Sequence, residues 1–369
     1  MRLHRLPVML FLIILLTLSV TSILPSSLAV EEQQPWVKFS GNPVLTPTLG
    51  EWDADFVVEP KVIYNGSTYK MWYVGSKQGA TAIGYAESTN GVSWKKHATP
   101  VLTRGEQGSW DSNEVGLGSV NWNGTQFLMW YRGVSPGFVS GAIGLALSSD
   151  GVVWVKYAGN PVLRPSVVDL RFIGTPYVLK TSALYNMWYA ARAEDDPPTS
   201  QILRILYANS FDGVHWDKFT GVPTVALQPS SASTDWDSGS VYSPSIYFDG
   251  GNYGMWYSAL NQTFLEPRTG FAASKDATTW TKFSANPVLS PGPSGSWDSA
   301  GVDNPNVITG ELGFMLFYDG IGEKVAGSIG FAQPPMGFEI PEFNQSLLFL
   351  GAVMLVAVSL IKRNLRRKT

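Results

Sequence analysis

The sequence contains no cysteine and only three histidines, and charged side chains make up only 15% of its 369 residues. Without cysteine there is no disulfide framework and no thiolate chemistry. One histidine, His4, stands just before the N-terminal apolar run, which leaves His97 and His215 in the rest of the chain. This scarcity excludes a histidine-based metal cluster, and a catalytic histidine is not expected. No segment has the period of an amphipathic helix, so the chain is expected to be all-β. No cofactor is expected.

Long apolar runs occur only at the two ends. Arg2 and Arg5 precede an apolar stretch from 6 to 24 that ends in small residues, which predicts a signal peptide over 1–29, with a retained N-terminal anchor as the alternative. Residues 335–346 are expected to form a short stalk, 347–361 a transmembrane anchor and 362–369 a basic cytoplasmic tail. The protein is therefore predicted to lie on the extracellular face of the plasma membrane. The end of the chain also resembles the C-terminal sorting signals of archaeal surface proteins.

The remaining body is acidic. The two terminal segments hold seven of the 26 cationic residues, so 19 cations face 29 acids and the net charge of the exported part is near -10. Nucleic acids and anionic membrane surfaces are poor partners for such a body. A monomer is expected, joined to the membrane only by its anchor.

What the chain does contain is a repeat. The run Met-Trp-Tyr occurs four times, and a relaxed Leu-Phe-Tyr copy follows; the middle residues are 72, 130, 188, 256 and 317, so the spacings are 58, 58, 68 and 61. Each run is preceded by an Asp and a β-rich segment that contains Pro in four of five copies. The first four are followed by an Asn-Gly or Asp-Gly turn, or a variant of it, with Trp three residues later. Such turns are a strong hairpin signal. Five units of four short strands predict a five-bladed β-propeller over residues 34–334.

One extra copy of the fourth-strand motif indicates how the ring closes. Trp36-Val37-Lys38-Phe39, followed by Asn42-Pro43-Val44-Leu45, matches segments that elsewhere follow the turn, but it stands before the first Met-Trp-Tyr run. Residues 34–40 are therefore predicted to supply the outer strand of the last blade. Closure of this kind leaves no open sheet edge.

In a repeat protein, whatever recurs in every unit holds the unit together, and departures are free to serve function. By this criterion the Met-Trp-Tyr runs and the Trp-Asp pairs are structural, with sugar stacking by the Trp residues as the alternative reading of those pairs. The departures lie in the first strand of each unit, just before the Pro position. Those that a structural account does not require are Glu59, Glu114, Arg171 and Asp303, all expected near the entrance of the central channel. For each of them a structural role is the alternative to catalysis, either as a buried carboxylate whose hydrogen bonds are all made or as a solvated charge at the rim.

These units resemble the five-bladed glycosidase superfamily of arabinanases, levansucrases and invertases. The resemblance implies a channel ringed by three carboxylates, and Glu59-Pro60 stands where the base or nucleophile is expected. The general acid expected in the third unit is missing, because that stretch reads Gly174-Thr175-Pro176 with only Asp169 and Arg171 nearby, and in the second unit Leu117 stands where an acid is expected. The resemblance therefore implies the propeller fold more firmly than it implies the three catalytic carboxylates.

The candidate residues follow from these two arguments. Glu59, Glu114 and Asp303 are the candidate catalytic residues, and the candidate substrate-binding residues are Arg171, Asp55, Asp169, Tyr242 and Asn304. Glu59 and Glu114 are expected on neighbouring inner strands, one protonated through burial and the other ionised against Arg171. No metal site is predicted.

Three functions remain open at this point. The first is a surface glycoside hydrolase, and the second is a non-catalytic propeller that binds carbohydrate or protein. The third is a sialidase-like propeller, suggested by the Ser-x-Asn-Gly-x-x-Trp turn. The unit number and the absence of an arginine triad speak against the third.

Overall fold

A computed structural model describes residues 35–136, 141–166, 172–181, 184–192, 202–218, 225–263, 266–311, 313–323 and 327–335. The predicted signal peptide, anchor and tail, together with Asp169 and Arg171, lie outside these residues. Within them, no helix with the length and apolar character needed to cross a membrane is found.

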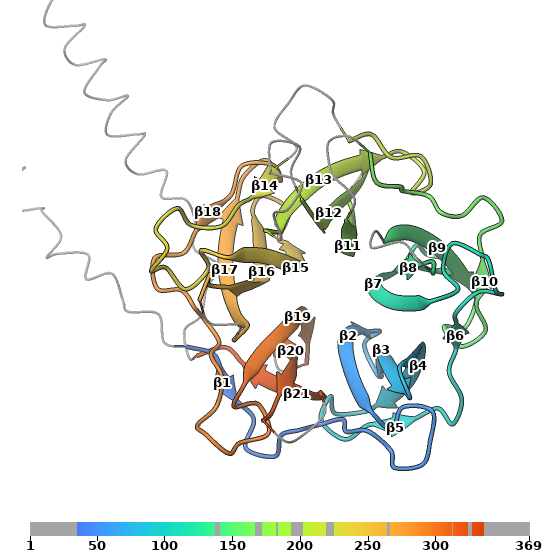
Figure 1. Ribbon diagram of the computed structural model, residues 1–369, viewed down its shortest axis with the longest axis horizontal. Coiled ribbons are helices and arrows are strands. Elements are labelled where there is room, and N and C mark those ends of the chain that lie inside the picture. The colour runs from blue at the N-terminus through green and yellow to red at the C-terminus, as the bar shows by residue number, and fades with distance from the viewer. Residues whose placement is uncertain are drawn as a thin grey trace, which may run out of the picture. The chain divides into compact units, whose positions relative to one another are not determined.

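Five antiparallel sheets are arranged around a central axis (Figure 1). Blade 1 consists of β2 (Phe56–Tyr64), β3 (Tyr69–Lys77), β4 (Ala80–Ser88) and β5 (Lys95–Lys96), with β6 (Leu102–Thr103) also pairing with β4. Blade 2 consists of β7 (Glu114–Trp122), β8 (Phe127–Val134), β9 (Ala142–Ser148) and β10 (Val155–Lys156). Blade 3 consists of β11 (Ile173–Lys180), β12 (Tyr185–Ala191), β13 (Arg204–Ser210) and β14 (Val225–Leu227). Blade 4 consists of β15 (Ser240–Phe248), β16 (Tyr253–Leu260), β17 (Arg268–Ser274) and β18 (Thr281–Lys282).

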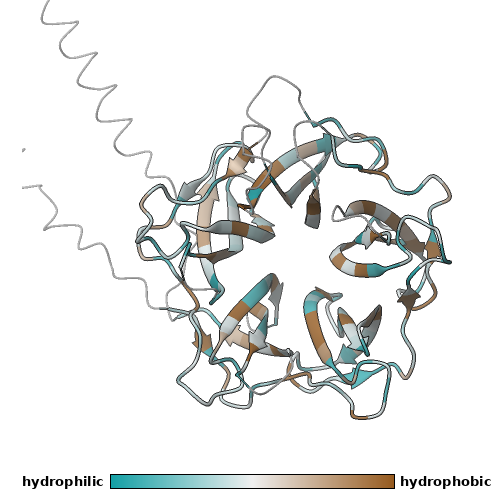
Figure 2. Cartoon of the chain, in the orientation of Figure 1, coloured by the Kyte–Doolittle hydropathy of each residue, from teal (hydrophilic) through white to brown (hydrophobic). Residues whose placement is uncertain are grey.

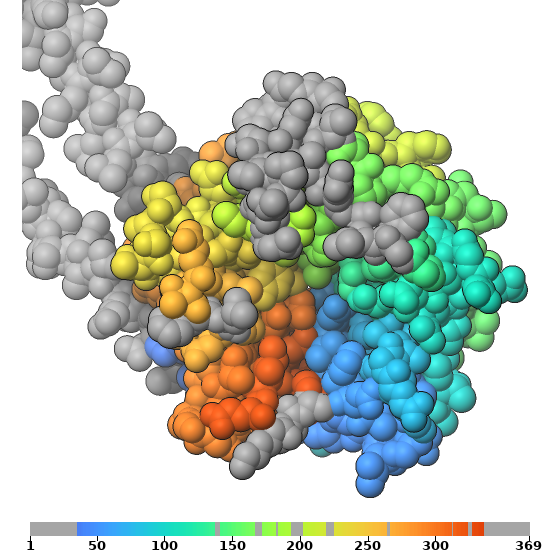
Figure 3. Space-filling view, viewed as in Figure 1, coloured from blue at the N-terminus to red at the C-terminus, as the bar shows by residue number. Residues whose placement is uncertain are grey.

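Blade 5 is built from both ends of the propeller segment. It comprises β19 (Gly301–Gly310), β20 (Gly313–Ile321), β21 (Ser328–Gln333) and the N-terminal β1 (Val37–Lys38). β1 pairs antiparallel with β21, with Val37 opposite Gln333 and Lys38 opposite Ala332. The structure thus confirms the predicted five-bladed propeller and its closure by the N-terminal strand, and Figure 3 shows neighbouring blades abutting around the axis.

The Met-Trp-Tyr runs form the second strand of each blade and are fully buried. Their side chains pack between neighbouring blades, as in the cluster that joins Trp72 of blade 1 to Met129 of blade 2. The indole N–H of Trp72 donates to the Gly151 carbonyl at 2.8 Å, so the turn of one blade is fixed to the core of the previous one. Figure 2 shows apolar residues, in brown, as bands along the strands of every blade. The structural interpretation of these runs is confirmed.

The Asp residues of the Trp-Asp pairs are also structural. In four blades the Asp is buried, accepts a hydrogen bond from the Tyr of the Met-Trp-Tyr or Leu-Phe-Tyr run and pairs with a Lys of the outermost strand. The Asp–Lys pairs are Asp53–Lys96, Asp111–Lys156, Asp237–Lys282 and Asp298–Lys38, with N–O distances of 2.5, 2.6, 2.5 and 2.5 Å. The last pair joins the N-terminal β1 to the segment before β19, so a partly buried ion pair supports the ring closure.

Candidate functional site

Each innermost strand carries a β-bulge at the same place, next to the Pro position. In four blades the residue before the proline has a positive φ: 56° at Glu59, 41° at Thr175, 47° at Ser243 and 47° at Asn304. Non-glycine residues in this region carry backbone strain of order 1–3 kcal/mol each. The surrounding hydrogen bonds must therefore hold them in place, and four such residues form one ring around the axis.

These hydrogen bonds form a belt from blade to blade. Ser243 N donates to the Thr175 hydroxyl at 3.3 Å, and the Ser243 hydroxyl donates to Asn304 Oδ1 at 2.5 Å. Asn304 Nδ2 donates to Asp319 Oδ2 at 2.7 Å, and Glu59 N donates to Asp319 Oδ1 and Oδ2 at 2.8 and 3.1 Å.

The belt continues from Glu59 into blade 2, where Leu117 N donates to Glu59 Oε2 at 2.6 Å. Glu59 therefore accepts the same kind of bond as the Thr175 hydroxyl does. One oxygen of Glu59 serves the fold, and a hydroxyl is enough for that task in blade 3. The carboxyl group itself is more than the belt requires.

A second belt runs two residues further along the same strands, directly after the Pro position. There Asn306 accepts from Val62 N at 2.8 Å, Ser119 from Val178 N at 3.1 Å and Ser245 from Val307 N at 2.9 Å. The equivalent residue of blade 1 is Lys61, whose ammonium has no lone pair to offer as an acceptor. Lys61 is nevertheless only 6% exposed, so a cation is buried where other blades place an acceptor.

Lys61 belongs to an electrostatic cluster with three carboxyl groups, those of Glu59, Asp303 and Asp319. Burial lowers the pKa of Lys61, while the three acids act in the opposite direction. Burial raises the pKa of Glu59, opposed by Arg132, by the bond from Leu117 N and by Lys61. Burial thus displaces Glu59 towards its protonated form, while the charges of Arg132 and Lys61 act against this displacement.

Asp303 and Asp319 face each other across β19 and β20 as a register pair. Burial raises the pKa of both carboxyls, and for Asp319 the charge of Asp303 raises it further. Asp319 is thus displaced towards its protonated form by burial and by the neighbouring acid. Tyr242 completes this side of the cluster, since its hydroxyl donates to Asp303 Oδ2 at 3.3 Å.

Glu114 lies on the neighbouring inner strand in a different environment. Its carboxylate accepts a hydrogen bond from, and forms an ion pair with, Arg132 of β8, and both side chains are partly exposed. Gly116 lies between the carboxyl of Glu59 and the guanidinium of Arg132. A Cβ at this position would stand 3.2 Å from Glu59 Oε2 and 3.4 Å from Arg132 Nε. The absence of that side chain lets Arg132 approach both Glu59 and Glu114.

The structure brings most of the predicted site together, though not all of it. Glu59, Asp303, Tyr242 and Asn304 share one network, and Glu114 joins it through Arg132. Asp55 lies apart, because its carboxyl accepts bonds from the Ser76 hydroxyl and from Gly79 N, both at 3.3 Å, at the β3–β4 turn. The binding roles of Asp55, Asp169 and Arg171 stay predictions. Among the described residues, Arg132 takes the place that the sequence suggested for Arg171.

Four members of the network were missed, namely Lys61, Arg132, Ser258 and Asp319. Three of them occupy one repeat position, directly after the Met-Trp-Tyr or Leu-Phe-Tyr run, where the five units read Val74, Arg132, Ala190, Ser258 and Asp319. Ser258 accepts Asn304 N at 2.9 Å. This position departs from its pattern as strongly as the first strand does, so the same criterion would have found it. Within the described residues, no group of three or more acidic or histidine side chains has an arrangement suited to a metal ion.

No model of a known protein family matches the chain. Two uncharacterized proteins of Mycobacterium tuberculosis, from strains CDC 1551 / Oshkosh and ATCC 25618 / H37Rv, are each 28% identical over 229 residues, which is 61% of this chain and 73% of theirs. Among solved structures, one described as a glycoside hydrolase has a TM-score of 0.66 at 21% identity, covering 85% of this chain and 96% of its own.

A thermostable family-43 glycoside hydrolase has a TM-score of 0.61 at 18% identity, over 80% of this chain and 98% of its own. A structure from work on mannoside phosphorylases and hydrolases of β-1,2 mannosidic linkages has a TM-score of 0.64 at 14% identity, over 86% and 99%. The structural neighbours are thus five-bladed β-propellers of the glycoside hydrolase type. At these identities the likeness shows the fold.

Proposed function

We propose that the protein acts on glycans in its central channel as a glycoside hydrolase. The observation that carries this proposal is a pair of carboxyls in unlike environments on neighbouring inner strands. Burial displaces Glu59 towards its protonated form, whereas Glu114 is ion-paired with Arg132. Glycoside hydrolysis uses one carboxylic acid and one carboxylate across the scissile bond. Environments that separate the pKa values of two acids assign these roles.

In this mechanism Glu59 donates the proton to the leaving oxygen. Glu114 is the ionised partner, acting as base or nucleophile. The Asp303–Asp319 pair, with Tyr242 and Asn304, lies on the opposite side of Glu59 and supplies polar contacts to a bound sugar. The glycoside hydrolase fold of the structural neighbours supports the same substrate class.

The test is turnover of an oligosaccharide panel by the purified protein beside Glu59→Gln. The amide oxygen of Gln still accepts Leu117 N, so the inter-blade belt stays intact while the proton donor is lost. We expect hydrolysis to fall about 10²–10⁴-fold, the usual contribution of a general acid, with binding retained. The isosteric control is Glu311→Gln, which changes an exposed acid on the β19–β20 turn. Equal turnover by wild type and Glu59→Gln would remove Glu59 from the mechanism.

A second candidate is a non-catalytic glycan-binding propeller. It is favoured by the structural use of Glu59 Oε2, which accepts Leu117 N as the Thr175 hydroxyl accepts Ser243 N. This alternative predicts that the protein binds an oligosaccharide of the panel without hydrolysing it. The same binding is then expected in Glu59→Gln.

We also propose that the propeller lies outside the cell, joined to the membrane by residues 347–361. The support is the sequence alone: an apolar run followed by Lys and Arg at one end, and a signal-like segment at the other. Protease treatment of intact cells tests this. Digestion of the propeller, with its basic tail protected, is expected; protection of both would place the propeller inside.

A further inference from the structure

A hollow of about 580 Å³ opens between blades 1 and 2, outside the carboxyl cluster. Its wall combines one aromatic ring, two cations and several amide and hydroxyl groups. The lining residues on which the argument depends are Trp52, Lys77, Gln78, Arg104, Gln107 and Ser112. Among the described residues, no acidic side chain lines it, although the propeller as a whole is acidic.

The two cations are departures from the repeat. Arg104 stands two residues after Leu102, whose equivalents in the other blades make the same kind of pairing with the third strand. The residue two positions after those equivalents is proline in all four cases: Pro47, Pro165, Pro229 and Pro291. Only blade 1 has a guanidinium here, so the arginine is not required by the blade.

Lys77 departs in the same way. It stands six residues after the first residue of its Met-Trp-Tyr run, where the other four units have Ser135, Ala193, Asn261 and Gly322. Two positions that elsewhere carry no charge thus both carry a cation, and both line one hollow. The criterion that found the channel cluster therefore identifies this surface as a second functional feature.

Both cations retain hydrogen-bonding capacity. Lys77 Nζ donates to the Gly50 carbonyl, and Arg104 Nη1 donates to the Asn113 carbonyl at 3.2 Å. An ammonium has three N–H donors and a guanidinium five. Neither side chain forms an ion pair with another residue of the described chain, and both are exposed. Together they present uncompensated positive charge to a ligand.

Trp52 gives the hollow a flat apolar wall. Its ring stacks on Tyr73, with centroids 5.8 Å apart and planes at 23°, and it also packs on the glycine backbone at Gly75 and Gly84. The ring is thereby fixed while remaining partly exposed to the hollow. A rigid aromatic face of this kind suits the apolar face of a sugar ring.

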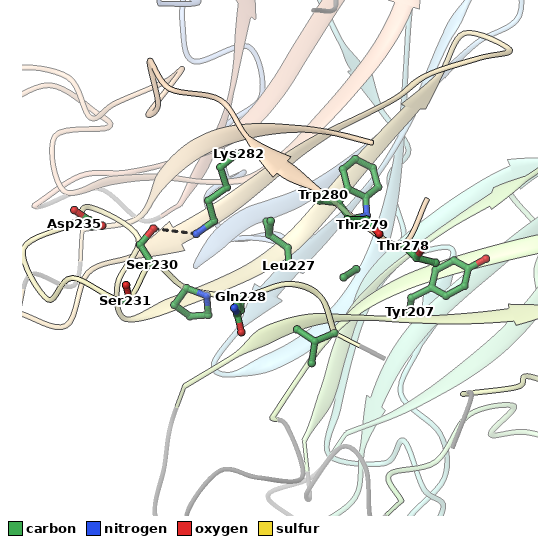
Figure 4. A pocket seen from close by; sticks show the side chains of 13 residues that line it. Tyr207, Leu227, Gln228, Ser230, Ser231, Asp235, Thr278, Thr279, Trp280 and Lys282 are labelled. Atoms are coloured by element: carbon green, nitrogen blue, oxygen red, sulfur yellow. Dashed lines mark hydrogen bonds between the residues drawn. The ribbon is translucent and has the colours of Figure 1, made fainter. Parts of the chain in front are cut away.

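A larger hollow of about 910 Å³ between blades 3 and 4 shows what is particular about this one (Figure 4). It also has a tryptophan and a lysine, Trp280 and Lys282. There, however, Lys282 is paired with Asp237 at 2.5 Å and bonded to Ser230 at 3.1 Å, and Asp235 adds an acid to the wall. Its positive charge is compensated within the protein, so it offers no site for an anion.

We propose that the hollow between blades 1 and 2 binds an acidic sugar unit of a glycan. Trp52 stacks on the sugar ring, while Lys77 and Arg104 pair with its carboxylate and Gln78 and Gln107 bind its hydroxyls. The inference rests on the proposed glycan function for the nature of the ligand, but it does not need the channel to be catalytic. Ser112 of the hollow lies two residues before Glu114, so a glycan held here is next to the segment that enters the channel.

The test is calorimetric titration of the whole protein with an oligogalacturonide, beside a neutral dextran oligosaccharide and a sulfated dextran. Binding of the oligogalacturonide is expected, with Arg104→Gln and Lys77→Gln each weakening it about tenfold, the scale of one charge-assisted hydrogen bond. The matched control is Lys95→Gln, an exposed lysine of blade 1 that does not line the hollow. Raising the salt concentration should weaken binding in the wild type more than in either variant.

The outcomes separate this inference from the channel chemistry. Glu59→Gln should bind the oligogalacturonide as tightly as wild type, even if hydrolysis is lost or was never present. Equal binding of the neutral and acidic oligosaccharides, or equal losses in Lys95→Gln and Arg104→Gln, would overturn the proposal. Preference for the sulfated chain over the carboxylated one would also overturn it, because the site would then be a general polyanion surface.

Discussion

Replacing Glu59 by Gln should change how the stability of the propeller depends on pH. The pKa of Glu59 is raised by folding above its unfolded value of about 4.5, so the folded state holds a proton that the unfolded state releases. The stabilising contribution of such a group is complete below the unfolded pKa and is lost as pH rises through the folded pKa. In that window one group changes the free energy of unfolding by up to about 1.4 kcal/mol per pH unit.

Glu59→Gln removes this contribution to the slope but keeps an acceptor for Leu117 N. We therefore expect the free energy of unfolding of the variant to fall less steeply with pH above 4.5 than that of the wild type. At neutral pH the variant should be at least as stable as the wild type. Urea unfolding followed by tryptophan fluorescence at several pH values measures both quantities.

Glu311→Gln is again the matched control, and its pH profile should follow that of the wild type. Identical profiles for wild type and Glu59→Gln would show that Glu59 titrates as an exposed glutamate. In that case the proton that the proposed mechanism needs at neutral pH would be absent, and the reasoning from burial would be refuted.

Two further predictions concern the same cluster and the ring closure. Lys61→Met removes the positive charge that acts on Glu59, Asp303 and Asp319 and should lower the free energy of unfolding at neutral pH, and this loss should shrink in acid as the facing carboxyls become protonated. A loss independent of pH would mean that packing, not charge, is responsible. Lys38→Met leaves the buried carboxylate of Asp298 without its cation and should lower the midpoint of urea unfolding. The control Lys95→Met, on the surface of blade 1, should leave that midpoint unchanged. Equal midpoints for the two variants would show that the Lys38–Asp298 pair does not hold the ring closed.

The fold could be predicted from the sequence because every blade of the propeller carries the same sequence pattern. Five copies of one pattern reveal which positions are core, and the displaced Trp36 copy alone predicts that the N-terminal strand completes blade 5. Periodicity is a local property of the chain, and closure follows from counting its copies. The structural roles of Trp72 and its equivalents could be predicted for the same reason.

Only part of the site could be predicted from the sequence. Glu59, Asp303 and Asn304 lie in the strand where departures were sought, so sequence comparison between units found them. Arg132 and Asp319 lie on the second strand, where comparison between units reveals the departures, but only the structure shows that these residues meet those of the first strand. That convergence arises only when neighbouring strands twist around a common axis.

The sequence by itself determined the number of blades, the closure and the set of residues free to vary. Only the tertiary structure decided which of these residues meet and in what state of charge. It brought Lys61 and Asp319, which are 258 positions apart, into one buried cluster, and it paired Arg132 with Glu114. The physical reason is that burial and the distances between charges set a pKa, and both are properties of the assembled ring.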